Sequence, residues 1–152
     1  MAARYWVGGT DNWNATVGTK WATTSGGAGG AAVPTSADDV FFDANSGAVT
    51  VTVTATANSL TLTFTGFTGT FAGSSGLTTR TSLILDAGMT LTYTGTLSFI
   101  NLTNALSLTS NGITWTGAIT FTSTITTTLV DDWTVTGTVT SAGTINGNNI
   151  YL

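Results

Sequence analysis

The 152-residue chain carries only three basic and seven acidic side chains, has a formal net charge of −4, and contains neither histidine nor cysteine. Without those two residue types, Ser-His-Asp and Cys-His triads, disulfides and zinc–sulfur sites are excluded, so we predict a protein that is not an enzyme and holds no cofactor. Three scattered cations and a negative net charge also argue against binding to nucleic acid or to an anionic membrane surface.

The first predicted segment, residues 1–48, is rich in tryptophan and contains the only proline of the chain. We expect a short strand at residues 5–7 and another at residues 39–42, with loops between them. If the rest of the chain is a stack of coils, the bulky rings of this segment would cover the apolar end of the stack. The same rings could instead contact a partner protein or a glycan. They belong to Trp6, Trp13 and Trp21.

The second predicted segment, residues 49–152, is a succession of short strands in which apolar residues alternate with threonine. A Thr-x-Thr-Gly phrase recurs in it and begins at Thr92, Thr114 and Thr134. Its spacing of about 21 residues fits one coil of a β-solenoid, in which each unit buries its apolar side by stacking on the next. The predicted strands are residues 49–55, 59–65, 82–85, 90–94, 105–109, 113–115, 119–121, 127–130, 133–136 and 149–152.

The repeat also predicts which side chains face the core. Tyr93, Trp115 and Val135 occupy the same position in successive copies, so they should form a buried column, with columns of outward hydroxyl groups on either side. We therefore predict an all-β chain that forms a parallel β-helix of about five coils, with an N-terminal Trp-rich cap. An antiparallel β-sandwich is the alternative, because short alternating strands alone do not separate the two architectures.

Two neighbouring carboxylates, Asp131 and Asp132, are the best candidates for chemistry. They could bind calcium, or act as acid and base in glycoside hydrolysis, if their side chains converged. Adjacent residues on a strand point to opposite faces, however, and no calcium-loop spacing surrounds the pair. We interpret the pair as turn residues, and whether the two carboxylates bind a cation stays open at this stage. The same interpretation applies to Asp38, Asp39, Asp43 and Asp86.

A distinctive pattern covers the first 44 residues. It comprises residues 4–10, Trp13 and Trp21, and residues 33–44, which read Val-Pro-Thr-Ser-Ala-Asp-Asp-Val-Phe-Phe-Asp-Ala. This pattern resembles a module of bacteriophage structural proteins. Spaced tryptophans followed by Pro and Asp-Asp-Val are also similar to the start of β-helical adhesins and autotransporter passengers. The resemblance implies a β-helical body at a virion surface and capsid or tail proteins as partners, and it supplies no catalytic residues.

We therefore expect a non-enzymatic structural protein of the virion surface, a capsid decoration protein or short fibre that acts as a homo-oligomer through subunit contacts. The alternative is a carbohydrate- or receptor-binding tail fibre or adhesin, extracellular or at a cell surface. It would need an exposed aromatic groove. A lesser alternative is ice binding, because ranks of threonine on a flat face resemble the surface of insect-type antifreeze proteins. We expect those ranks to break at residues 73–81, and β-branched residues also suit strands for ordinary reasons.

Overall fold

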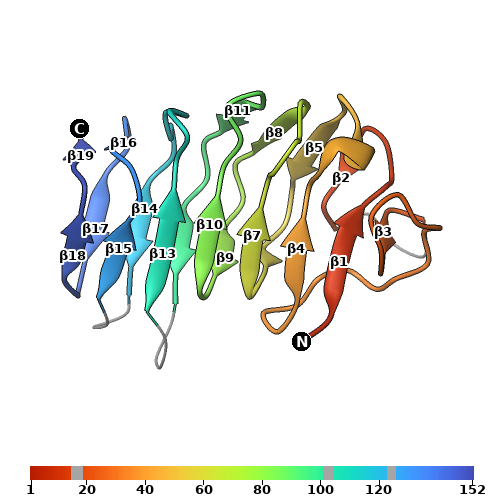
Figure 1. Cartoon of the computed structure of the whole chain (residues 1–152), viewed down its shortest axis with the longest axis horizontal. Helices are drawn as coiled ribbons and strands as arrows, with labels where there is room; N and C mark the ends of the chain where they lie inside the picture. The colour runs from red at the N-terminus through yellow and green to blue at the C-terminus, as the bar shows by residue number, and fades with distance from the viewer. Residues whose placement is uncertain (15–18, 101–104, 123–125) are drawn as a thin grey trace.

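The computed structural model describes residues 1–14, 19–100, 105–122 and 126–152, which form a parallel β-solenoid (Figure 1). This confirms the predicted all-β class and parallel β-helix, and the antiparallel sandwich is not adopted. Within the described residues one strand pair, β1 with β3, is antiparallel. No helix in those residues has the length and apolar character needed to cross a bilayer.

The largest sheet runs along one side of the stack and takes one strand from each coil (Figure 1). Five of its parallel strands come from residues 49–152, which agrees with the predicted number of coils. The sheet consists of β3 (Trp21–Ala22), β1 (Ala3–Trp6), β4 (Asp39–Phe41), β7 (Thr61–Thr63), β10 (Ser82–Ile84), β13 (Leu106–Thr109), β15 (Thr127–Leu129) and β18 (Ile145–Gly147), in that spatial order.

Three smaller sheets complete the coils. One contains β2 (Asp11–Asn12), β5 (Thr50–Val53), β8 (Thr70–Gly73) and β11 (Thr90–Tyr93). Another contains β6 (Ala57–Asn58), β9 (Leu77–Thr79), β12 (Leu97–Phe99), β14 (Ile119–Phe121) and β17 (Val139–Ser141). The last pairs β16 (Trp133–Thr134) with β19 (Ile150–Tyr151), and a 3-10 turn, η1 (Ala44–Ser46), follows β4.

The inner columns follow the register of the main sheet. One column contains Val40, Leu62, Leu83, Leu108 and Leu129, and all five side chains are buried. These residues alternate with outward polar ones, so the period of two that marks the sequence also separates core from surface.

The predicted column of the Thr-x-Thr-Gly phrase is confirmed. Tyr93, Trp115 and Val135 have no exposed surface. The rings of Tyr93 and Trp115 lie 5.4 Å apart, and Trp115 forms a parallel bridge with Val135. The expected strand at residues 113–115 is reduced to this single bridge, because the chain on its N-terminal side turns at Asn111 and Gly112, both with positive φ.

The N-terminal Trp-rich cap is confirmed as a buried aromatic cluster at the first coils. Two of its segments were predicted as loops, yet they contribute the short strands β2 and β3. β1 and β4 stand in the same sheet as five strands of residues 49–152. The division of the chain near residue 48 therefore stays a prediction, although three of the five tryptophans lie before it.

Candidate functional site

The three tryptophans predicted as possible partner or glycan contacts lie inside the fold. Trp6 and Trp13 have no exposed surface, and Trp21 exposes 1% of its own. Trp21 meets the other two edge to face, with ring centroids 5.0 Å from Trp6 and 5.1 Å from Trp13. Two indole nitrogens donate within the molecule, Trp6 Nε1 to the Gly9 carbonyl and Trp21 Nε1 to the Trp13 carbonyl. A glycan would reach these rings only if this end opened, so their role as a binding contact stays a prediction.

Asp131 stabilises the turn of the preceding coil by accepting hydrogen bonds from it. Its Oδ1 accepts the Ser110 N–H at 2.7 Å, and its Oδ2 accepts the Asn111 N–H at 2.6 Å and the Ser110 hydroxyl at 3.1 Å. Asn111 has a φ of 48°, a conformation that non-glycine residues seldom adopt. The side-chain amide of Asn111 in turn donates to the Leu85 carbonyl at 2.7 Å. One carboxylate and one amide therefore tie three successive coils together.

Other aspartates serve turns in the same way. Asp86 Oδ2 accepts the Gly66 N–H of the preceding coil at 2.7 Å, while Oδ1 accepts the Gly88 N–H of its own turn at 2.8 Å. Asp43 Oδ1 caps η1 by accepting two of its N–H groups. These carboxylates therefore satisfy backbone donors where the coils turn. Within the described residues, no three acidic or metal-ligating side chains are grouped to hold an ion.

Replacing Asp131 by alanine should lower the free energy of unfolding by about 2–3 kcal/mol, because two backbone N–H groups would lose a charged acceptor. The neighbouring Asp132 provides a matched control. It is exposed, and its Oδ1 accepts the Asn149 N–H at 2.9 Å at the outer coil. We expect a smaller loss for Asp132→Ala in chemical denaturation. Equal losses for the two variants would contradict the role assigned to Asp131.

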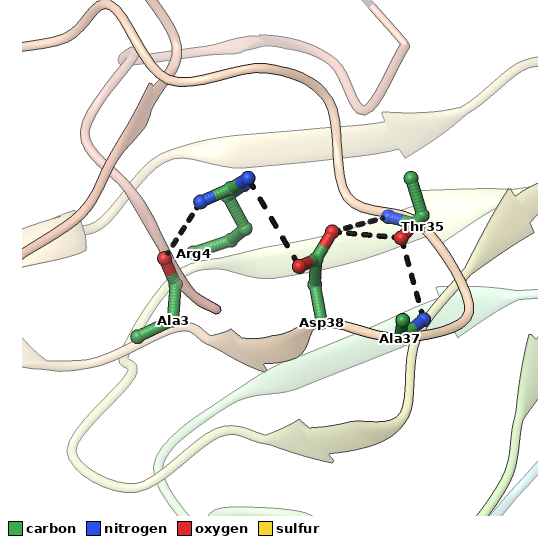
Figure 2. Close-up of polar contacts among 5 residues, drawn as sticks. All are labelled: Ala3, Arg4, Thr35, Ala37 and Asp38. Carbon is green, nitrogen blue, oxygen red and sulfur yellow. Dashed lines mark hydrogen bonds and ion pairs between the residues drawn. The ribbon is translucent and has the colours of Figure 1, made fainter. Parts of the chain in front are cut away.

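Asp38 forms a small polar cluster with the N-terminal strand (Figure 2). Its Oδ2 accepts both the N–H and the hydroxyl of Thr35 at 2.9 Å, and its Oδ1 lies 4.0 Å from the guanidinium of Arg4. Burial alone would raise the pKa of Asp38, but the Thr35 hydrogen bonds and the Arg4 charge outweigh it and hold the pKa below its ordinary value. The Lys20 ammonium at 2.7 Å likewise lowers the pKa of Asp11.

These two lowered pKa values predict acid sensitivity. A carboxylate whose pKa is lower in the folded state stabilises the fold above the unfolded pKa, here about 3.8, and this contribution is lost as the pH falls through the folded pKa. The melting temperature should therefore decrease as the pH is lowered below about 4. The variant Asp38→Asn should show a shallower acid dependence in thermal melts between pH 2 and pH 6. An unchanged slope would contradict the assignment.

The threonines of the repeated phrase face outward, as predicted. Thr94, Thr116 and Thr136 are exposed in successive coils. The Thr116 hydroxyl donates to the Tyr93 carbonyl at 2.8 Å, so part of its hydrogen-bonding capacity is used within the fold. A second outward column runs in register through the sheet that contains β9. This column passes through residues 73–81, where we expected the threonine ranks to break. It consists of Asn58, Thr78, Ser98, Thr120 and Thr140.

A further candidate surface, which the sequence did not assign to particular residues, is the face of the outermost coil near β17 and β18. Val139, Ile145 and Ile150 lie there, on the edge of the hydrophobic core, and are only half-buried. The strand pattern around Val139 was visible in the third Thr-x-Thr-Gly phrase. A local sequence pattern does not show, however, which coil is outermost, that is, which coil has no described residues stacked on its outer side.

The described part of the chain contains no pocket, so the candidate surfaces are the hydroxyl columns on the sides and the outermost coil face. No family model, curated protein or solved structure matches the chain. The β-solenoid fold is established by the structure itself. The resemblance to phage and adhesin modules stays a prediction, because no comparison tests it.

Proposed function

We propose that the chain is a non-enzymatic structural protein of a bacteriophage virion surface, a capsid decoration protein or short fibre that acts through contacts between subunits. The observation that carries the proposal is the contrast between the two ends of the stack. The first coil is sealed by buried tryptophans, whereas the outermost coil leaves apolar side chains half-buried. A stiff stack with one such end is suited to joining other proteins.

The sides of the stack fit this role. The two outward columns described above consist of short, uncharged hydroxyl and amide side chains, which keep the protein soluble without the entropy cost of ordering long charged side chains at a contact. The carboxylates described above accept hydrogen bonds from backbone donors and thereby serve the fold itself. The virion setting is supported by the sequence resemblance of residues 4–44.

The test is to look for the chain in purified particles. Density-banded virions would be probed with an antibody raised against the chain and imaged after immunogold labelling. We expect the label on regularly spaced surface positions, and mass spectrometry of the same band should detect the chain at a fixed ratio to the major capsid protein. Recovery only in the particle-free fraction would overturn the virion assignment.

The exposed threonine columns favour ice binding as a second candidate. Under that reading Thr136→Tyr should abolish thermal hysteresis by disturbing one flat face, while Thr128→Tyr, on the exposed face of β15, should leave it unchanged. An absence of thermal hysteresis in the unaltered chain would eliminate this candidate. The adhesin alternative gains no such support, because the aromatic side chains proposed for it are buried.

A further inference from the structure

The two ends of the stack differ in whether another strand can be added. At the N-terminal end, β3 runs antiparallel to β1 and occupies its outer edge. The indole rings of Trp6, Trp13 and Trp21 close the apolar interior behind it. Figure 1 shows the loops of this segment folded over the end of the stack. A second solenoid therefore cannot stack on this end without displacing a buried cluster.

At the opposite end, β17 and β18 are the last strands of their sheets in the described residues. Parallel pairing uses alternate residues of each strand. On either side of β17, the Thr138 carbonyl accepts a hydrogen bond from β14 and the Ala142 N–H donates one to it. Val139 and Ser141, which alternate with them, therefore direct their N–H and C=O groups away from the stack.

The same alternation holds for β18. The Thr144 carbonyl accepts the Thr127 N–H at 2.9 Å, and Asn148 donates to the Leu129 carbonyl at 3.4 Å. Ile145 and Gly147 lie between these bonded positions, so their backbone groups also point outward along the axis of the stack. An edge with such free donors and acceptors is a template for pairing with another strand.

The side chains of this end are apolar and uncharged. Val139, Ile145 and Ile150 continue inner columns of the stack and are half-buried. No charged side chain lies between Trp133 and Leu152. The nearest charged side chain is that of Asp132, which precedes this segment and accepts the Asn149 N–H. Residues 133–152 themselves therefore add no repulsion between like side-chain charges when two copies of this end approach each other.

We propose that two copies of the chain join through this end, related by a two-fold axis, so that the strands of the outermost coils pair antiparallel. This deepens the proposed function and rests on it, since it names the partner in the subunit contact. A two-fold contact uses the same surface on both copies and closes on itself. The sealed N-terminal end prevents head-to-tail growth, so the assembly stops at a dimer.

Sedimentation equilibrium of the full chain tests the proposal. The unaltered protein should show a mass twice the 15.4 kDa of one chain. Ile145→Lys places an ammonium group at the contact and should weaken dimerisation roughly 100-fold or more, because each copy would bury an unpaired charge. Asn146→Lys is the matched control, since Asn146 is the next residue of β18, is exposed and faces outward. It should leave the dimer intact.

Hydrogen exchange provides a readout that needs no variant. The amides of Val139 and Ile145 should exchange more slowly as the protein concentration rises through the dimer dissociation constant. A protein that is still monomeric at 100 μM would have a dimer dissociation constant weaker than roughly 10⁻⁴ M, and this result would overturn the proposal. So would an open-ended series of larger species, or equal weakening by both lysine variants. A different protein bound at this end would also overturn it. The virion test above is independent, so a monomer found on particles would refute the dimer alone.

Discussion

Replacing Phe42 by alanine should lower the free energy of unfolding by about 4 kcal/mol, because the side chain is removed from the centre of an aromatic cluster that has little room to collapse. Phe42 has no exposed surface and stacks on Phe64 with ring centroids 4.8 Å apart and planes 8° apart. Its ring also lies within 6.1 Å of three indoles and two further phenylalanines, namely Trp6, Trp13, Trp21, Phe67 and Phe71.

The neighbouring Phe41 is the matched control. It is the last residue of β4, directly before Phe42, but it faces outward, is only half-buried, and stacks on Tyr5 with centroids 4.7 Å apart. Phe41→Ala should therefore cost about 1 kcal/mol, the contribution of one exposed aromatic pair. Urea denaturation followed by tryptophan fluorescence would measure both variants, since the cluster itself contains the fluorophores. Similar losses for Phe41 and Phe42 would contradict the cap as a main source of stability.

The parts of the fold that could be predicted are those encoded locally and repeated. The Thr-x-Thr-Gly phrase assigned Tyr93, Trp115 and Val135 to one buried column, because a period near 21 residues and an alternation of two leave little freedom. Strands β2 and β3 could not be predicted in this way. Each has two residues, which is too short to show alternation, and each depends on pairing with strands distant in the sequence.

The site residues show the same limit. The sequence placed Asp131 in a turn, but its acceptor role depends on Ser110 and Asn111, about 21 positions earlier, and thus on the register between coils. The free edge beside Val139 is likewise a property of the stack. Its residues resemble those of buried coils, and only the order of the strands shows that no described strand pairs with this side.

The sequence predicts where the glycines of the repeated phrase lie in the coils, but not why glycine is required there. Gly95, Gly117 and Gly137 stand at the same place in successive coils. None of them has a positive φ, so conformational freedom does not explain them. A Cβ on Gly117 would lie closer than 3.0 Å to the Gly95 carbonyl oxygen, and one on Gly137 would be as close to the Gly117 carbonyl oxygen. Each glycine therefore lets its backbone approach the coil below.

Gly117→Ala should therefore lower the free energy of unfolding by about 3 kcal/mol, because the added methyl group meets backbone that cannot rotate aside. The coils would have to separate locally, and this would weaken their hydrogen bonds. Thermal unfolding by circular dichroism would measure the loss.

Gly76→Ala is the matched control for Gly117→Ala. Gly76 has no positive φ, and a Cβ there would meet nothing within 4 Å. Alanine at that site should be neutral or should stabilise the fold by roughly 0.5 kcal/mol, since it restricts the unfolded chain. If Gly117→Ala were as stable as Gly76→Ala, the coils would not be held as closely at this corner as the structure places them. The glycine column would then need another explanation.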